Sequence, residues 1–500
     1  MSVATLPRTA EADQTGVRMV SGAGAQSRVW LWLAVVLSLV SALPVMVAQY
    51  PQLTDYPAHL ARYHVMLDNG HSPWLAKYYA FLWTWTGNLG VDLLIRPFAA
   101  VFGLELGGRI IVGLIGPLSG LGIVAVEWAL RRRVSFGSFL ALSLIWSPML
   151  VMGLINYALG QAVAFWAFAA WVWLEGKRWR PWVFLPLSLV VWLCHLSAWG
   201  VLGIMVFGYE WHRQKSWRAL IAPWPLLAPL AVMLLVHGST SGEFSYGHHW
   251  WYYKFAMWLR ATRDTNETLD SWTLVLVGVA IVVATALRRI DGRLGWGALI
   301  LVVGSWGIPR HISGGDFADY RMITAGLAVA CMAIDWPQRW PVLSLAAVGL
   351  FLLRISVTSQ GWYANSLEMA EQLKALDYVP EGASVASAVL TPVEFWPINP
   401  FEHIGAYSVV RKDALCNANF AVPHIHMLHL HKTGYVDPSQ RLFQPYRAKV
   451  DMAKFKPAED ADYLWYVGPR APDTMPAGAV IIWRGPHSFL ARLAKTAEKD

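Results

Sequence analysis

The sequence is poor in charged residues. Only 14% of its 500 residues are Asp, Glu, Lys or Arg, whereas soluble chains carry about 25%. Hydrophobic residues make up 56%, and they gather in runs of roughly 17–22, long enough to cross a hydrocarbon layer about 30 Å thick. The shortage of charge therefore excludes an ordinary soluble protein and predicts a chain that crosses a membrane many times.

Cysteine is also scarce, and nucleotide-binding motifs are missing. The three cysteines are too few for a disulfide framework; Cys194 and Cys331 lie in apolar segments, which leaves Cys416 alone in the C-terminal part. The sequence has no P-loop, no dinucleotide fingerprint and no G-x-S-x-G motif. We therefore expect no cofactor.

The formal net charge of +8 comes from basic residues in short loops that directly follow apolar runs. These clusters lie at Arg131–Arg133, Lys177–Arg180, Arg213–Arg218 and Arg288–Arg293. Basic residues concentrate in the cytoplasmic loops of membrane proteins. The charge is therefore a topology signal, with contact to anionic membrane lipid a minor addition, and it does not indicate a nucleic-acid partner.

With these loops inside the cell, the runs predict a mostly α-helical, polytopic protein with about 11 transmembrane helices. Residues 181–209 are too long for one simple span and are basic at both ends, so we interpret them as two short helices meeting near His195. A single tilted helix would move every later loop to the other side. The other spans are expected near 29–49, 107–130, 135–152, 157–174, 219–237, 272–288, 294–308, 322–335 and 340–356.

Three regions follow from this topology. Residues 1–28 form a disordered cytoplasmic leader, 29–357 the transmembrane domain, and 358–500 a small α/β domain outside the cytoplasm. Outer loops are expected at 50–106, which should carry interfacial helices, at 238–271 and at 309–321. The α/β prediction rests on helical spacing and on strand-like stretches. These are Leu367, Ala370, Leu373 and Leu376 for the helix, and Ala383–Leu390, Tyr463–Val467 and Ala479–Trp483 for the strands.

The first outer loop carries the motif TDYPAHLAR, residues 54–62. Pro57 suits a helix start, and the spacing of Asp55, His59 and Arg62 by four and three puts them on one helix face. An Asp before a Pro-led helix also fits a simple N-cap, and Arg62 fits a side chain that reaches to lipid headgroups. Spacing alone leaves both interpretations open.

This motif and layout resemble the GT-C superfamily of integral membrane glycosyltransferases, which use polyprenyl-phosphate-linked sugars. The resemblance rests on residues 54–62 and on a first span followed by a long outer loop with an acidic residue, and it extends to residue 357. It implies transfer of a hexose or pentose from a polyprenyl-phosphate donor to a glycan, lipid or protein acceptor outside the cytoplasm. The short loops favour a bacterial inner (plasma) membrane, crossed many times.

The resemblance also implies roles for single residues. Asp55 would be the general base, since an attacking hydroxyl needs a proton acceptor, with Arg62 in a supporting role and His59 as a hydrogen-bond partner of Asp55. The departing phosphate needs fixed positive charge. We assign donor-phosphate binding to the outer-loop residues Arg310, Arg321 and Arg96.

Some members of the superfamily have a second acidic residue in an outer loop. The candidates here are Asp92, Asp316 and Asp319, none of them in a motif, so the use of a divalent metal stays open. Asp92 precedes Arg96 by four, which equally predicts an intrahelical ion pair. Asp319 and Arg321 are close enough in sequence to interact locally.

Histidines give further candidates. His195 lies in an apolar run and His249 in the 238–271 loop, although a satisfied core histidine and a solvated loop residue fit them as well. The tail sequence His424-Ile-His426-Met-Leu-His429-Leu-His431 invites a metal site. No carboxylate or cysteine stands at a helpful spacing, so an interfacial strand or turn explains it without metal.

Two other classes of function stay open. A transporter or flippase of lipid-linked glycans should show inverted repeats and broken spans with polar groups near the midplane. The polar residues here gather in the outer loops instead, which favours an enzyme. A non-catalytic partner in polysaccharide assembly would keep the same fold without the chemistry.

Overall fold

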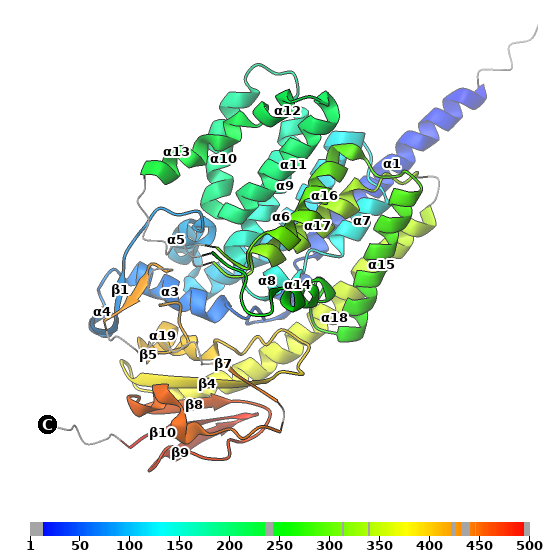
Figure 1. Ribbon diagram of the computed structural model, residues 1–500. Helices are drawn as coiled ribbons and strands as arrows, with labels where there is room; N and C mark the ends of the chain where they lie inside the picture. The colour runs from blue at the N-terminus through cyan, green and yellow to red at the C-terminus, as the bar shows by residue number, and fades with distance from the viewer. Residues whose placement is uncertain are drawn as a thin grey trace, which may run out of the picture.

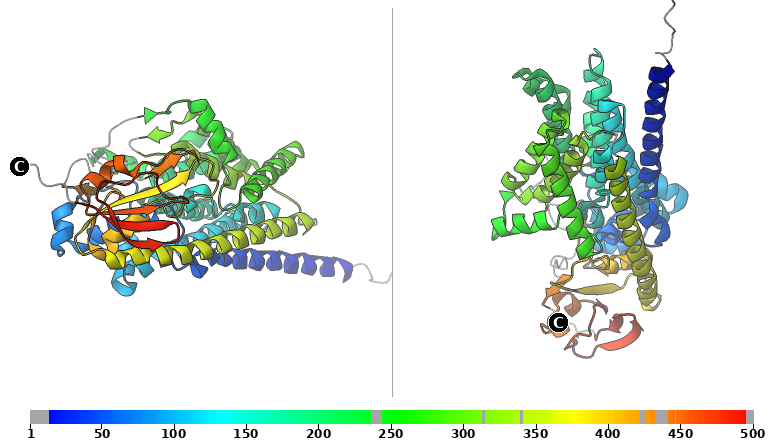
Figure 2. Two further views of the ribbon diagram at one scale, coloured as in Figure 1. Left: turned by 90° about the horizontal axis from the view of Figure 1, so that it is seen from below. Right: turned by 90° about the vertical axis from the view of Figure 1, so that its right-hand side faces the viewer.

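The computed structural model describes residues 14–235, 244–312, 315–338, 341–421, 426–431, 441–445 and 447–494. The chain is mostly helical, and a small sheet follows in its C-terminal part (Figure 1). The N-terminal helix α1 (Gln14–Val40) and the C-terminal sheet lie at opposite ends of the molecule (Figure 2). This arrangement fits a sheet domain on the side of the membrane opposite to the N-terminus.

The helical body is built from helices of very different length. In chain order they are α2 (Leu43–Val47), α3 (Tyr56–Asp68), α4 (Pro73–Tyr78), α5 (Gly90–Phe102), α6 (Leu104–Arg131), α7 (Phe136–Leu142), α8 (Pro148–Val151), α9 (Ile155–Trp173), α10 (Arg180–Cys194), α11 (Leu196–Gln214), α12 (Arg218–Ile221), η1 (Trp224–Leu227), α13 (Ala228–Leu235), α14 (Trp250–Leu259), α15 (Glu267–Ala286), α16 (Gly292–Gly307), α17 (Ala318–Ala333) and α18 (Pro341–Leu373). Between them lie the short strands β1 (Tyr79–Phe81), β2 (Phe244–Ser245) and β3 (His311–Ile312).

Among the described residues, five helical segments are long and apolar enough to cross a membrane, judged by length and composition. They are Ser27–Val47, Leu104–Arg131, Ile155–Trp173, Glu267–Ala286 and Pro341–Tyr378. Each overlaps a predicted span. The polytopic character of the chain is thus supported, while the number of eleven spans is not confirmed.

Apart from the short turn between α1 and α2 in the span near 29–49, two predicted spans are not continuous helices. The run near 135–152 forms α7 and α8 with a break between them, and the run near 219–237 is divided into α12, η1 and α13. Proline explains both breaks, because it lacks an N–H and disfavours helical geometry in the residue before it. Pro148 begins α8, and Pro223 and Pro225 separate α12 from α13. Hydropathy detects such apolar runs but not their interruptions.

The segment 181–209 is two helices, as predicted. α10 ends at Cys194, His195 has extended backbone angles, and α11 begins at Leu196. The two helices pack against each other and against α9. The alternative of a single tilted helix is therefore excluded.

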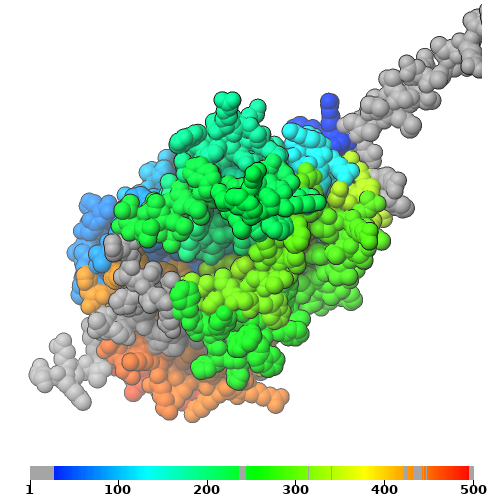
Figure 3. All heavy atoms as spheres, turned by 45° about the horizontal axis from the view of Figure 1, so that its top comes forward, coloured from blue at the N-terminus to red at the C-terminus, as the bar shows by residue number. Residues whose placement is uncertain are grey.

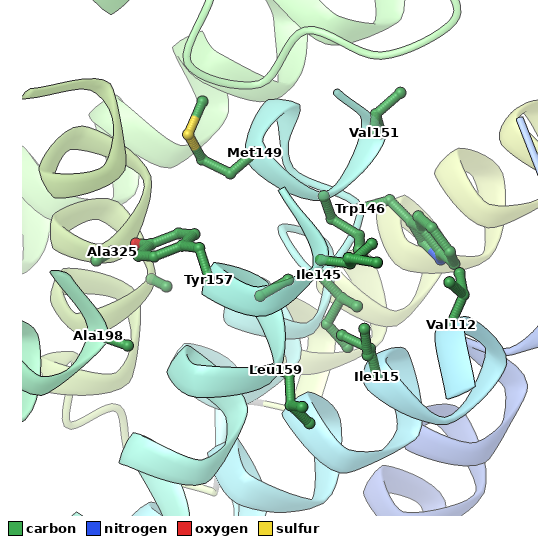
Figure 4. Close-up of a cluster of buried hydrophobic side chains, with 14 of the residues drawn as sticks. Val112, Ile115, Ile145, Trp146, Met149, Val151, Tyr157, Leu159, Ala198 and Ala325 are labelled. Atoms are coloured by element: carbon green, nitrogen blue, oxygen red, sulfur yellow. The ribbon is translucent and has the colours of Figure 1, made fainter. Parts of the chain in front are cut away.

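The hydrophobic body is held by close helix packing, seen in the buried cluster of Figure 4. The crossing of α11 and α16 is especially tight: a Cβ added to Gly208 would lie 2.5 Å from the backbone nitrogen of Gly297. Small residues allow membrane helices to approach this closely. A side chain at Gly208 must therefore push the two helices apart.

We expect Gly208→Ala to lower the free energy of unfolding by about 1–3 kcal/mol, because it overpacks this crossing. Thermal unfolding of the detergent-purified protein measures the effect. Gly203→Ala is the matched control, since a Cβ there meets nothing within 4 Å and reports only the helix-propensity gain. Equal unfolding temperatures of the two variants would contradict the tight crossing.

The C-terminal part forms a mixed sheet with the strand order β5-β4-β8-β10-β9, and β7 also pairs with β4. Its central strand β4 pairs in parallel with β5, β7 and β8, and it is buried on both faces. The elements of this part are η2 (Lys374–Tyr378), β4 (Ser384–Pro392), η3 (Ile404–Ala406), α19 (Tyr407–Lys412), β5 (Leu415–Cys416), β6 (Leu428–Leu430), β7 (Arg441–Gln444), η5 (Met452–Lys454), η6 (Lys456–Glu459), β8 (Tyr463–Val467), β9 (Val480–Gly485) and β10 (Ser488–Arg492).

The three predicted strands correspond to β4, β8 and β9, so the expected α/β character of the tail is confirmed. The boundary predicted at residue 357 falls inside α18, which runs without interruption for 33 residues to Leu373. The helical body and the sheet domain therefore share one long helix.

The sheet domain packs directly against the first outer loop (Figure 3). α3 contacts α5 and α6 on one side and η3, α19 and β6 on the other. β1 of the same loop pairs with β6 of the tail. α3 is consequently buried along most of its length, because the helical body and the C-terminal domain cover it from two sides.

Candidate functional site

Asp55 lies at the N-terminus of α3, where the helical body meets the sheet domain. Its backbone nitrogen donates to the Met152 carbonyl at 3.0 Å, and its side chain makes no capping hydrogen bond. Instead, its Oδ1 lies 3.6 Å from Nε2 of His403 in the sheet domain, and the side chain is only 16% exposed. Asp55 thus occupies the N-cap position without the N-cap contact, and its carboxylate faces protein rather than bulk water.

The backbone around Gly153 fixes the place of Asp55. Gly153 has a φ of +92°, and a Cβ added there would lie 2.8 Å from the Cβ of Asp55. Only glycine combines this backbone conformation with such a close approach. The turn between α8 and α9 therefore packs closely against the N-terminus of α3 and fixes its position.

His59 points to the same turn and not to Asp55. Its Nε2 lies 3.2 Å from the Gly153 carbonyl oxygen, and its Nδ1 lies 3.4 Å from Nη2 of Arg62. Since Arg62 can only donate, Nδ1 accepts and Nε2–H donates to the carbonyl. Burial, assisted by the Arg62 charge, lowers the pKa of His59 well below its usual value. His59 is therefore a neutral, satisfied histidine, and its predicted hydrogen bond to Asp55 is wrong.

The positive charge of Arg62 is neutralised by a buried carboxylate inside the protein. Its Nη2 lies 2.9 Å from Oδ1 and 3.0 Å from Oδ2 of Asp92 on α5, and the Asn156 amide on α9 donates to the same carboxylate at 3.0 Å. Both charged side chains are buried. Arg62 therefore does not reach lipid headgroups, and this network ties α3, α5 and α9 together.

The predicted intrahelical pair between Asp92 and Arg96 is wrong. Asp92 is fully buried and bound to Arg62, whereas Arg96 is exposed. Within the described ranges, no ion pair involves Arg96. The physical reason is that a buried carboxylate needs a counter-charge that is also out of water, and a tertiary neighbour supplies one.

Replacing Asp92 with Leu should lower the free energy of unfolding by about 3–5 kcal/mol, because it leaves the Arg62 charge buried and unpaired. The double variant Arg62→Met, Asp92→Leu should recover much of this loss. Chemical denaturation in mild detergent measures both. Glu371→Leu, which breaks an exposed pair with Lys374, should change stability little. A double variant no more stable than Asp92→Leu would contradict this account.

The outer loop around residues 309–321 contains two further ion pairs. Arg310 binds Asp316 through two hydrogen bonds of 2.8 and 2.9 Å. Asp319 lies 2.7 Å from Nζ of Lys254, and both side chains are fully buried. The expected local interaction between Asp319 and Arg321 is therefore wrong, since the Asp319 carboxylate forms its ion pair with Lys254 of α14.

Sequence reasoning missed Lys254. The signal was present, since Lys254 is a single cation within the aromatic and apolar run of α14, WWYYKFAMWL, and an isolated charge in such a run is a candidate by default. Its Nζ also donates to the Ser305 carbonyl at 2.9 Å. Lys254 thereby fastens α14 to the end of α16.

Arg321 differs from these cations. It lies in the first turn of α17 with only 8% of its surface exposed, and its guanidinium carbon is 5.7 Å from the ring centre of Tyr157. Its Nε has no hydrogen-bond partner, and no acidic group in the described part of the chain is within ion-pair distance of it. Figure 4 shows Tyr157 reaching from α9 towards α17 near Ala325. Arg321 is thus a buried cation without a counter-charge of its own.

His195 lies beside Tyr157, the aromatic ring next to Arg321. Its ring is edge-on to Tyr157 with centres 5.4 Å apart, and its Nδ1 accepts a hydrogen bond from the Ser197 backbone nitrogen at 3.0 Å. His195 therefore caps α11, so a backbone amide satisfies it. The structure brings His195 and Arg321 together around Tyr157, which the sequence spacing could not indicate.

The remaining candidates lie apart from these groups. His249 is exposed at the start of α14. His426 is half-buried and stacks on Phe420 with ring centres 5.1 Å apart, and loss of solvent around it lowers its pKa to about 3; His424 lies outside the described residues. Within the described ranges, no group of three or more His, Cys, Asp or Glu side chains could hold a metal ion.

Comparisons with known proteins give one finding of similarity. No protein-family model matches the sequence, and no curated protein matches it. The structure is similar to the crystal structure of ArnT from Cupriavidus metallidurans bound to undecaprenyl phosphate, with 14% sequence identity and a TM-score of 0.48. The similarity covers 92% of this chain and 97% of that one.

Proposed function

We propose that this protein is a membrane glycosyltransferase of the GT-C type, which transfers a sugar from a polyprenyl-phosphate donor to an acceptor outside the cytoplasm. Asp55 serves as the general base and Arg321 binds the donor phosphate. The observation that carries the proposal is the buried, uncompensated guanidinium of Arg321. The acceptor is a glycan, a lipid or a protein.

Pairing and burial together single out Arg321 among the candidate cations, since Arg96 is exposed to solvent. Asp92 neutralises Arg62, Asp316 neutralises Arg310, and Asp319 neutralises Lys254. A buried charge is costly unless it is paired. The remaining buried arginine is therefore suited to an anionic ligand, and a guanidinium binds phosphate with two parallel hydrogen bonds.

An apolar groove favours a lipid-linked phosphate over a free one. It has a volume of about 280 Å³ and runs along α11 and η1, lined by Trp199, Gly200, Gly203, Phe207, Leu226 and Leu227. Trp199 lies one turn after His195, whose ring touches Tyr157 beside Arg321. A phosphate at Arg321 could thus carry an isoprenoid chain that lies in this groove.

One short segment connects the proposed base with the proposed phosphate site. Gly153 packs against Asp55, and Tyr157 lies against Arg321. Four residues of extended chain cover at most about 14 Å. The turn that positions Asp55 and the ring that packs on Arg321 therefore belong to one region of the protein, which supports a single site for the acceptor and the donor phosphate.

The proposed reaction is a single displacement. The acceptor oxygen loses its proton to Asp55 and forms a bond to the anomeric carbon. The bond from that carbon to the phosphate oxygen breaks, and its electron pair stays with the polyprenyl phosphate facing Arg321. A single step of this kind inverts the configuration at the anomeric carbon.

Asp55→Asn should reduce transfer by about 10²–10⁴-fold, since the amide keeps the size of the side chain and cannot accept the proton. We would measure release of polyprenyl phosphate by the full chain in liposomes, using undecaprenyl-phosphate hexoses and pentoses with envelope extract as acceptor. Asp68→Asn, at the other end of α3 where the carboxylate bonds the backbone of Gly70, is the control. Undiminished release by Asp55→Asn would remove Asp55 from the mechanism.

Arg321→Met should weaken binding of undecaprenyl phosphate about 10- to 100-fold, as expected for a lost charge-assisted contact. Native mass spectrometry in detergent measures this binding, with undecaprenol as the uncharged reference. Arg96→Met removes an exposed charge of the same type and should leave binding nearly unchanged. Equal binding by Arg321→Met and the wild type would contradict the phosphate site.

The two experiments also separate the rival functions. Binding that depends on Arg321, together with movement of the lipid-linked sugar across the liposome membrane and no transfer by the wild type, would favour a transporter or flippase of lipid-linked glycans. Binding with neither movement nor transfer would favour a non-catalytic partner in polysaccharide assembly.

A further inference from the structure

The sheet domain contributes a histidine to the surroundings of Asp55. His403 lies just before η3 and is almost completely buried. Its Nε2 is 3.6 Å from Oδ1 of Asp55, and its Nδ1 is 3.2 Å from the Ala418 carbonyl oxygen. The ring also packs edge-on against Phe420, with centres 5.4 Å apart. Three contacts from the sheet domain and α3 thus hold this imidazole in place.

The contact with Ala418 assigns the protons of His403. A carbonyl oxygen only accepts, so Nδ1 carries the hydrogen. In the neutral ring, Nε2 then presents its lone pair towards the Asp55 carboxylate. Two proton-accepting atoms that face each other can share one proton, and the pair then titrates as a unit.

We propose that His403 is the positioning residue of Asp55 and receives from it the proton of the acceptor. This inference rests on the proposed function. The acceptor O–H bond breaks as the bond to the anomeric carbon forms; the proton passes through Asp55 to Nε2, and the phosphate leaves with the electron pair. The product state is an imidazolium beside a carboxylate, and the opposite charge of the carboxylate favours the protonated form of the imidazole.

The neighbouring charges permit an imidazolium at His403. Two other histidines, His59 and His426, also surround Phe420, and burial keeps both neutral by lowering each pKa. Arg62, the cation on α3, is bound to Asp92. Glu402, the preceding residue on the same segment, adds a second buried carboxyl group. Of the three histidines around Phe420, His403 is the one that faces Asp55.

The proposal fixes the direction of a pH effect. Transfer needs the unprotonated pair and is lost as the pH falls through the apparent pKa of the pair. His403 adds a second basic atom, so this apparent pKa lies above that of a lone carboxyl group. Removing the imidazole should shift the acidic limb of the kcat/KM profile to lower pH and should also lower the plateau, because the remaining base is weaker.

The test compares His403→Gln with the wild type as full chains in liposomes. Glutamine keeps a hydrogen-bonding side chain but cannot take up the proton. We would follow polyprenyl phosphate release from undecaprenyl-phosphate hexoses and pentoses over a range of pH. We expect a shift of the acidic limb by at least one pH unit and a plateau reduced about 10-fold or more. His426→Gln is the control, since His426 stacks on the same Phe420 ring, and it should leave the acidic limb in place.

The outcomes separate this inference from the proposed function. A folded His403→Gln variant with an unshifted limb would overturn the role of His403, provided that Asp55→Asn is inactive. An active Asp55→Asn variant would overturn the proposed base itself. If His403→Gln does not fold, the wild type alone decides, since an acidic limb below about pH 5 belongs to a lone carboxyl group and would also overturn the pair.

Discussion

The interior of this protein is largely apolar, so a buried charge is costly unless another charge pairs with it. The network of Arg62, Asp92 and Asn156 meets this requirement for α3, α5 and α9 at once. It holds α3 between the helical body and the sheet domain, and so it fixes where Asp55 begins that helix. Without this match, burying the first outer loop would cost several kcal/mol for each ion.

The same requirement distinguishes the paired, structural cations from Arg321, the proposed ligand-binding cation. Lys254, Arg310 and Arg62 each have an aspartate partner, and the pairs of Lys254 and Arg62 each join two helices. Arg321 has an aromatic neighbour instead, and the aromatic face of Tyr157 stabilises a cation without neutralising it. A buried arginine in this state is prepared for an anion that arrives from outside the chain.

The sheet domain has a further part in the site beyond covering α3. Its strand β6 pairs with β1 of the first outer loop. The segment before η3 places His403 beside Asp55. Helix α18 joins the domain rigidly to the helical body. The proposed base, with one residue from each part, therefore keeps its geometry only while the domain remains docked.

Composition and periodicity determined the class of protein, the break at His195, the strands β4, β8 and β9, and the polar motif of residues 54–62. They could do so because burial in lipid and the geometry of strands each leave a local pattern in the sequence. The interruptions of two apolar runs were missed, since hydropathy does not register the effect of Pro148 or Pro223 on the backbone. Only the tertiary structure decided the partners of each charge. Asp92 pairs with Arg62 and not with Arg96, its neighbour in the sequence, and Asp319 pairs with Lys254. Asp55 contacts His403, which is almost 350 residues away in the sequence. The physical reason is that a charge out of water binds the counter-charge that folding brings nearest, and no local spacing carries that information.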